Sequence, residues 1–355
     1  MSYRVVQWAT GNAGRPALQA IIEHPQLELV GLLVHSKEKA GRDAGEIAGV
    51  DPVGVTATTD VDEVLALDPD CVSYMATGDL RPDEAVADMC RILESGANVV
   101  STSVVPLVFP PSAPRRYTDP LAAACEKGRT SCFTSGIDPG FANDLVPLVM
   151  SGFCKRIDSI RVMEILNYDT YDQPEVLFQT MGFGTPIDET PLLLLPGVLS
   201  LAWGGAVHAL AAGMGVELED LRETHEKWAA TETFTVPSGT IEKGTMAGLR
   251  FEVQGIVGGE PRIVVEHVTR MHDTAAPDWP RPGGHGSYRV QLDGDPRIKV
   301  ELEFEGEDGD HNAGGLLMTA MRVLNAIPAV CEAPPGLLSP LDLPLVTGAG
   351  LMPTR

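Results

Sequence analysis

The segment Ala9–Gly14 combines residue types that suit phosphate binding. It follows the apolar run Val5–Trp8, reads Ala-Thr-Gly-Asn-Ala-Gly, and leads into apolar residues at helical spacing. The usual dinucleotide fingerprint is Gly-x-Gly-x-x-Gly, and Ala9 stands at its first position here. Gly11 would let a pyrophosphate approach the backbone, and Gly14 would let a helix pack close to the preceding strand. The alternative is a purely structural glycine turn in another α/β fold. The residues predicted to contact a dinucleotide are Thr10, Gly11, Asn12, Ala13, Gly14 and Arg15.

The end of the second predicted strand is expected to contact the cofactor's ribose. An acidic residue there would bind the 2′-hydroxyl of NAD, whereas a hydroxyl and cations suit the 2′-phosphate of NADP. The chain offers Ser36 and Lys37, with Arg15 close by in the turn. We therefore predict NADP, with NAD possible because Glu38 follows directly. The alternative is that Ser36 and Lys37 are ordinary loop residues.

Three further loops follow predicted strands and are expected to contact the cofactor or substrate. In the last of these loops, residues 136–143, Asp138 and Asn143 could orient the nicotinamide carboxamide or a polar atom of the substrate. The alternatives are plain turns, hydroxyls that satisfy loop backbone, and a helix cap at Asn143. The loops are Ala76-Thr77-Gly78-Asp79, Ser101-Thr102-Ser103, and the segment from Gly136 through Asp138 to Asn143.

Transfer of a hydride to a C=O or C=N bond also needs a proton donor within hydrogen-bond reach. Tyr168 and His311 are the preferred candidates, because each lies where a predicted element ends or begins. Tyr171, His208 and His285 are further candidates, and each lone residue can equally be structural. The spacings of histidine, cysteine and acidic residues match no metal-ligand pattern, so no metal is predicted.

Composition narrows the class of protein. A chain of 355 residues suggests two domains, and a formal net charge of -23 argues against nucleic acid as a partner. The six cysteines are scattered, which predicts free thiols in a reducing, cytoplasmic setting. Residues 191–216 carry no charged side chain, but prolines and glycines interrupt them. We therefore expect a buried helix from about 197 to 212 and no membrane partner.

The first 140 residues alternate short apolar strands with amphipathic helices. This pattern predicts a doubly wound parallel sheet, that is, a Rossmann fold in the α/β class. The predicted strands are 3–9, 27–35, 53–57, 70–75, 97–101 and 130–135, and the predicted helices are 15–24, 43–48, 60–66, 82–95 and 117–127.

Beyond residue 141 the pattern changes to a period of two, which predicts an α+β domain with a mostly antiparallel sheet. The last segment, 333–355, is predicted to be an irregular tail. The predicted domains are 1–140 for the dinucleotide, 141–312 for substrate and dimerisation, and 313–355 returning to the first. The predicted strands are 160–168, 233–237, 246–257, 261–270, 286–293 and 298–304, and the helices are 175–182, 197–212, 217–228 and 316–327.

Four motifs of the chain are Trp8–Arg15, Ala40–Glu46, Gly136–Phe141 and Thr319–Pro328. Together these motifs resemble the dihydrodipicolinate-reductase-like oxidoreductases. Within that family the chain is most similar to the branch of 2,4-diaminopentanoate dehydrogenase and the native amine dehydrogenases. The resemblance implies an NAD(P)-binding Rossmann domain, a substrate domain, a homodimer, a small-molecule substrate, and hydride transfer between nicotinamide and a C=N or C=O carbon.

The chain departs from this branch at one position. The resemblance leads us to expect a glutamate just after the strand 97–102, where it would activate ammonia or water. The segment Ser101–Leu107 contains no carboxylate. Reductase chemistry on a small amine, imine or carbonyl therefore remains the prediction. The alternatives are a non-enzymatic NADP(H) sensor and an oxidoreductase acting on sugars or aldehydes.

Overall fold

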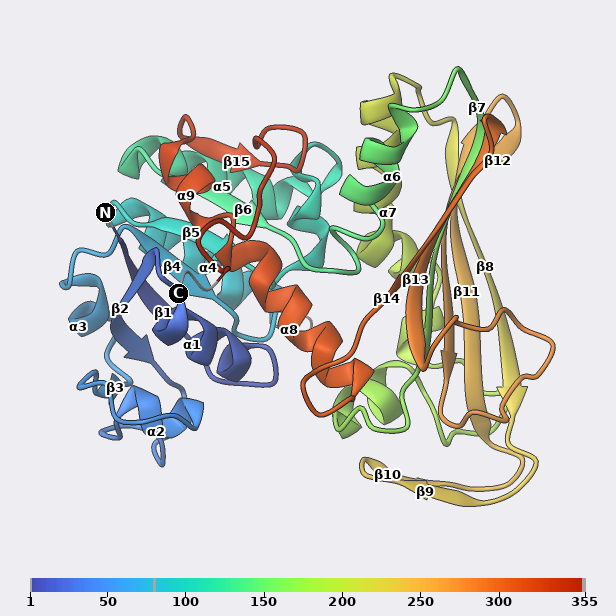
Figure 1. Cartoon of the computed structure of the whole chain (residues 1–355), viewed down its shortest axis with the longest axis horizontal. Helices are drawn as coiled ribbons and strands as arrows, with labels where there is room; N and C mark the ends of the chain where they lie inside the picture. The colour runs from blue at the N-terminus through green and yellow to red at the C-terminus, as the bar shows by residue number, and fades with distance from the viewer. Residues whose placement is uncertain (1, 79–80, 353–355) are drawn as a thin grey trace. The chain divides into compact units, whose positions relative to one another are not determined.

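The computed structural model describes residues 2–78 and 81–352. The chain forms two compact units (Figure 1). Unit 1 comprises Met1–Ile137 with Leu316–Arg355, and unit 2 comprises Asp138–Gly315.

Unit 1 contains a seven-stranded sheet in which every pair of neighbouring strands is parallel. Its strand order is β15-β6-β5-β4-β1-β2-β3. Because the strands are parallel, all of their carboxyl ends lie at one edge of the sheet. The strands are β1 (Tyr3–Trp8), β2 (Leu27–Leu33), β3 (Ala57–Thr58), β4 (Cys71–Tyr74), β5 (Asn98–Ser101), β6 (Ser131–Thr134) and β15 (Gly336–Leu338).

Helices cover both faces of this sheet, as alternating side chains of β1 illustrate. Val5 packs in a cluster with residues of α1, α8 and α9, whereas Val6 packs in a second cluster with residues of α4 and α5. This is the predicted doubly wound Rossmann architecture. The helices are α1 (Gly14–Glu23), α2 (Ala44–Ala48), α3 (Val61–Leu65), α4 (Pro82–Glu94), α5 (Arg115–Gly128), α8 (His311–Leu324), which belongs to this unit from Leu316 onward, and α9 (Ile327–Glu332), with short 3₁₀ turns at Val105–Val108 and Pro110–Ser112.

Unit 2 contains a six-stranded sheet in the order β14-β13-β7-β12-β11-β8. Its neighbouring strands are antiparallel except for β12 and β7, which are parallel. Helices α6 and α7 lie against one face (Figure 1). The strands are β7 (Arg156–Asn167), β8 (Asp220–Ala229), β11 (Met246–Val257), β12 (Glu260–Arg270), β13 (Gly286–Asp295) and β14 (Ile298–Glu303); the helices are α6 (Leu145–Ser151) and α7 (Val198–Met214), with a π-helical segment at Glu175–Thr180 and a 3₁₀ turn at Leu192–Leu194.

The two faces of the unit 2 sheet differ in chemistry. On the helix-covered face, side chains such as Val162 and Val265 join the main core of the unit. The opposite face carries an ion-pair network in which Arg161 and Arg250 both contact Glu266.

The helix predicted at 217–228 is wrong, because this segment forms the edge strand β8. Its glutamate, lysine and arginine residues favour helices intrinsically, so the sequence pattern resembles a solvated helix. In the fold, Leu221 and Trp228 pack against the core of unit 2, while β11 supplies the backbone partners. Cross-strand pairing therefore overrides the local preference.

Three other predicted elements differ from the structure. Residues 53–57 are mostly irregular, and only Ala57–Thr58 pairs with β2, because Gly54 adopts a left-handed turn with φ of 80°. Strand β9 (Phe234–Val236) forms a separate hairpin with β10 (Gly239–Ile241) instead of joining the large sheet. Within the predicted irregular tail, β15 adds a parallel strand beside β6. Strands β3 and β15 are too short to show a period of two in the sequence.

The longest apolar segments are explained by the cores. Helix α7 is part of the core of unit 2 and spans 17 residues. In the described chain, His311–Glu332 is long and apolar enough to cross a membrane by length and composition alone. Its residues Ala320, Leu324 and Ile327 are fully buried in unit 1, which accounts for its apolar character.

Candidate functional site

The turn between β1 and α1 has the close packing that its glycines predict. Ala9 adopts a left-handed backbone with φ of 73°, at the position that glycine usually holds in the fingerprint. A Cβ atom at Gly14 would lie 2.4 Å from the carbonyl oxygen of Ala9. Helix α1 can therefore begin directly over the end of β1 only because residue 14 has no side chain.

The same turn presents an open helix N-terminus. Gly11, Asn12 and Arg15 are exposed, and nothing described lies within 4 Å of a Cβ built at Gly11. No side-chain hydrogen bond caps α1 at Ala13. The first amide groups of a helix lack intrahelical partners, and the helix dipole favours an anion beside them. These features fit the pyrophosphate of a dinucleotide.

Lys39 is a residue of this site that sequence reasoning missed. Its ammonium donates hydrogen bonds to the carbonyl oxygen of Thr10, at 3.0 Å, and to the Thr10 hydroxyl, at 2.9 Å. Of the predicted residues, Lys37 is exposed, while the Ser36 hydroxyl accepts a hydrogen bond from the amide of Glu38 at 3.3 Å. The available signal was Lys39 itself, a long basic side chain six residues after β2 that can reach back to the turn.

The loops after β4 and β5 pack tightly against each other. The Ser103 hydroxyl donates to the carbonyl oxygen of Ala76, and the Ser101 hydroxyl accepts from the amide of Ser103 at 2.9 Å. A Cβ at Gly78 would lie 2.7 Å from the amide nitrogen of Val104. Ser101 and Ser103 therefore satisfy loop backbone. Thr77 is exposed and Thr102 is half-buried, and Asp79 lies outside the described residues.

Val104 stands where the resemblance leads us to expect a glutamate. It is buried in the apolar cluster of unit 1 and adopts a left-handed backbone with φ of 57°. This conformation is costly for a β-branched residue. The chain thus has an apolar, strained residue at this point instead of a carboxylate.

Two buried hydroxyl groups at the end of β6 have unsatisfied hydrogen-bonding capacity among the described residues. Thr134 Oγ1 and Ser135 Oγ are buried without a hydrogen-bond partner among the described residues, and Gly136 follows them. Buried polar groups usually have partners in native proteins, so each exception calls for an explanation. A bound polar ligand at the carboxyl edge of the sheet would satisfy them. This observation, together with the turn, fits a dinucleotide.

Unit 2 contains a buried ionic cluster on the helix-covered face of its sheet. In the strand register, Tyr288 of β13, Glu164 of β7, His267 of β12 and Phe251 of β11 form one row across the sheet. His267 Nε2 lies 3.0 Å from Asp138 Oδ1, and His267 Nδ1 lies 3.3 Å from Glu164 Oε1. The side chains of these three residues are at most 5% exposed. Sequence reasoning predicted Asp138 but missed Glu164 and His267.

Neighbouring aromatic groups fix this cluster. Trp203 Nε1 on α7 donates to Asp138 Oδ1 at 2.7 Å, and the Tyr168 hydroxyl donates to Glu164 Oε1 at 2.8 Å. The His267 ring stacks on Phe251 with a centroid separation of 4.6 Å and an interplanar angle of 10°. The predicted residues Asp138 and Tyr168 are therefore brought into one hydrogen-bonded group.

The electrostatics of the cluster favour a charged histidine. Burial by itself lowers the pKa of His267, but the attraction of Asp138 and Glu164 outweighs it and raises the pKa to about 10. Both ring nitrogens face a carboxylate, which requires two N–H donors. Burial, followed by the charge of Glu164, raises the pKa of Tyr168 and of Tyr288 well above the usual range, so both phenols stay neutral.

The other two predicted catalytic residues of unit 2 have structural contacts. Asn143 Oδ1 accepts a hydrogen bond from the amide of Gly140 at 2.9 Å, which closes the turn after Asp138. His311 Nε2 lies 2.6 Å from the carbonyl oxygen of Asn167, so it joins the start of α8 to the end of β7. Asn143 is not a helix cap, because Asp144 is the N-cap residue of α6. The Nδ2 atom of Asn143 is buried without a hydrogen-bond partner among the described residues, whereas His311 has a core contact.

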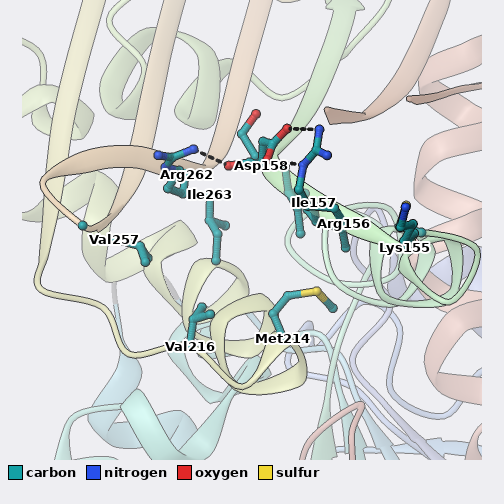
Figure 2. A pocket seen from close by; sticks show the side chains of 13 residues that line it. Lys155, Arg156, Ile157, Asp158, Met214, Val216, Val257, Arg262 and Ile263 are labelled. Atoms are coloured by element: carbon teal, nitrogen blue, oxygen red, sulfur yellow. Dashed lines mark hydrogen bonds and ion pairs between the residues drawn. The ribbon is translucent and has the colours of Figure 1, made fainter. Parts of the chain in front are cut away.

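A separate pocket of about 510 Å³ lies at the N-terminal ends of β7 and β12 (Figure 2). Its apolar part includes Met214 and Val216, and its polar part is organised around Asp158. Arg156 forms a two-point ion pair with the Asp158 carboxylate, and Arg262 donates to the Asp158 carbonyl oxygen at 2.9 Å. None of the predicted site residues lines this pocket.

Comparison with known proteins finds family matches in both the N-terminal and the C-terminal parts of the chain. Residues 141–352 match the family model of the 2,4-diaminopentanoate dehydrogenase C-terminal domain, and residues 5–74 match that of the dihydrodipicolinate reductase N-terminus. An amine dehydrogenase from Streptomyces virginiae is 47% identical over 349 residues, which cover 97% of each chain. The 2,4-diaminopentanoate dehydrogenase of Acetoanaerobium sticklandii is 25% identical over 72% of this chain and 68% of its own.

A solved structure supports the fold. The amine dehydrogenase from Mycobacterium smegmatis aligns with a TM-score of 0.79 and 20% identity, over 98% of this chain and 97% of that one. The chain therefore belongs to the dihydrodipicolinate-reductase-like family of NAD(P)-dependent oxidoreductases, in the branch that contains the amine dehydrogenases and 2,4-diaminopentanoate dehydrogenase.

Proposed function

We propose that this protein is a dehydrogenase of small amines, which it interconverts with the corresponding imine or carbonyl compound. The observation that carries the proposal is the open N-terminus of α1 beside Gly11, in a chain that is 47% identical to an amine dehydrogenase. When bound, the nicotinamide of the cofactor supplies the hydride acceptor or donor. The chain's own part is to hold that cofactor and a nitrogen-containing substrate.

Different residues of unit 1 are proposed to bind different parts of the cofactor. The amides after Ala9 would hold the pyrophosphate, and the partnerless hydroxyls of Thr134 and Ser135 would hold a polar group at the sheet edge. Lys39, fixed on Thr10, places a positive charge beside the same turn. None of the first three residues after β2 (Val34, His35 and Ser36) carries a carboxylate, and we propose NADP as the preferred cofactor on this ground.

Cofactor choice is expected to depend on Lys39 and Ser36. Lys39→Met removes a charged hydrogen-bond donor and should weaken NADPH binding by about tenfold or more, with a much smaller effect on NADH. Ser36→Asp adds a negative charge that repels the 2′-phosphate and should act in the same direction. Titration of both cofactors by fluorescence gives the two affinities for each variant.

Lys37→Met is the matched control, because Lys37 is an exposed neighbouring cation that makes no hydrogen bond to the turn among the described residues. It tests whether any loss of positive charge in this loop has the same effect. An equal loss of NADPH and NADH affinity in Lys39→Met would show that Lys39 supports the turn through Thr10 and does not recognise the phosphate.

The reaction itself is tested with a substrate panel. Small alkylamines should reduce NADP⁺, and the matching ketones with ammonia should oxidise NADPH, with absorbance at 340 nm as the readout. Sugars and aldehydes without ammonia should give less than about a tenth of these rates. Turnover of sugars alone would assign the protein to the sugar and aldehyde oxidoreductases.

One observation favours a second candidate, a sensor that binds the cofactor without turnover. Ser101–Leu107 contains no carboxylate, and buried Val104 occupies the position expected for the glutamate. Cofactor binding with no turnover across the whole panel would support this candidate.

We further propose a homodimer located in the cytoplasm. The six free cysteines suit a reducing compartment. Light scattering of the purified protein tests whether it is a dimer.

A further inference from the structure

The buried cluster of unit 2 has an imbalance of charge. His267 carries one positive charge between two carboxylates, Asp138 and Glu164. In the described part of the chain, both carboxylates form their ion pairs with His267 alone. The remaining polar neighbours named above, Trp203, Tyr168 and Tyr288, are neutral. One negative charge therefore remains uncompensated in a buried place, which is costly unless a cation joins it.

The structure also indicates where that cation would bind. Asp138 Oδ1 accepts from both Trp203 Nε1 and His267 Nε2, whereas Asp138 Oδ2 is buried and has no hydrogen-bond partner among the described residues. A carboxylate oxygen has two lone pairs and accepts charged N–H donors most strongly. The main chain at Asp138 is partly accessible although its side chain is only 1% exposed.

A metal ion fits this cluster less well than an organic cation. The ligand atoms of Asp138, Glu164 and His267 lie within 4.8 Å of one another, but the two carboxylates approach opposite nitrogens of the same ring. A protonated imidazole has no lone pair for a metal, because both nitrogens carry hydrogen. An alkylammonium ion needs only acceptor oxygens, and Asp138 Oδ2 offers one.

We propose that Asp138 binds the positively charged nitrogen of the substrate through Oδ2, with His267 and Trp203 as positioning residues and Glu164 supplying the second negative charge. This inference rests on the proposed function and adds the residue that selects a cationic amine. The bound R–NH₃⁺ gives one proton to the Asp138 carboxylate, which leaves R–NH₂ and a neutral carboxylic acid. The freed lone pair on nitrogen is what the α-carbon needs in order to lose a hydride. Asp138 therefore supplies the carboxylate that the segment Ser101–Leu107 lacks.

The test compares three ligands of equal length on the full-length protein by calorimetry at pH 8. These are n-pentylamine, 1-pentanol and pentanoate, which differ at this pH only in the charge and type of the head group. Wild type should bind pentylamine at least about tenfold more tightly than pentanol, and pentanoate most weakly. Asp138→Asn removes the negative charge with little change in shape and should abolish the preference for pentylamine.

Two further variants keep this result interpretable. Glu164→Gln neutralises the second carboxylate and should also reduce the preference, even if Asp138→Asn does not fold. Glu266→Gln is the matched control. Glu266 is a carboxylate on β12, the strand of His267, and its side chain is 1% exposed, but it faces the other side of the sheet and is paired with Arg161 and Arg250. It should leave the preference unchanged. Thermal unfolding of each variant shows that it is folded.

The outcomes separate this inference from the proposed function. Asp138→Asn and Glu164→Gln that both keep the preference for pentylamine would overturn the inference, even if wild type oxidises amines. A preference that depends on Asp138 in a protein without amine turnover would support the binding site and contradict the proposed function. Equal kcat/KM for amines in wild type and Asp138→Asn would also overturn the inference.

Discussion

Gly11→Ala should fold as stably as wild type and yet lose dinucleotide binding by about tenfold or more. A methyl group at Gly11 meets no described atom within 4 Å, and the backbone there is not left-handed, so the free protein has room for it. A pyrophosphate seated on the turn amides would meet that methyl group directly. Each tenfold loss of affinity corresponds to about 1.4 kcal/mol of binding free energy.

Gly14→Ala is the complementary variant. Its new methyl group would lie 2.4 Å from the Ala9 carbonyl oxygen, so α1 must move away from β1. Overpacking of this kind costs about 1–3 kcal/mol of stability, and displacement of the first amides of α1 weakens cofactor binding as well. Urea unfolding and NADPH titration measure the two effects. Wild-type affinity in a folded Gly11→Ala variant would show that the pyrophosphate does not bind at this turn.

Stability should fall as pH rises from about 6.5 to about 10, because of His267. Its carboxylate neighbours raise its pKa in the folded protein from 6.5 to about 10. A group with a raised folded pKa stabilises the fold fully below the unfolded pKa, and this contribution is lost as pH rises through the folded value. Since one pKa unit corresponds to about 1.4 kcal/mol, the loss over this window is on the order of a few kcal/mol.

His267→Gln isolates this contribution. Other buried groups, such as the Cys71 and Cys132 thiols, also have raised pKa values, and they change stability in the same direction at alkaline pH. The difference between wild type and His267→Gln removes these shared effects. Urea unfolding at pH 6, 8 and 10 should show a large gap at pH 6 that closes toward pH 10. A gap independent of pH would mean that His267 is neutral in the folded protein.

The sequence predicts the Rossmann half of this protein well because its signals are local. The turn at Ala9–Gly14 and the strict alternation of strand and helix each depend on neighbouring residues. Strand β8 was mistaken for a helix because its partner β11 lies many residues away in sequence, and only pairing shows that it is extended. Strand β15 consists of three residues and is likewise defined by its neighbour β6.

The ionic cluster could be predicted only in part. Asp138 stood out within Gly-Ile-Asp-Pro-Gly, but Glu164 and His267 lie inside two apolar strands that are far apart in sequence. A charged residue inside an apolar strand is a signal that it has a partner, since burying it alone is costly. The identity of that partner depends on the strand register, which places Glu164 directly opposite His267.

The tight contact between Gly78 and Val104 limits how amine chemistry could be engineered into this loop. A glutamate placed at residue 104 would inherit a left-handed backbone and a position only 2% exposed within an apolar cluster. Its carboxyl group would lack a counter-ion, so it would favour the uncharged form and destabilise the loop. Introducing a carboxylate here therefore requires exchange of both loops together, because a Cβ atom at Gly78 would already lie 2.7 Å from the amide nitrogen of Val104.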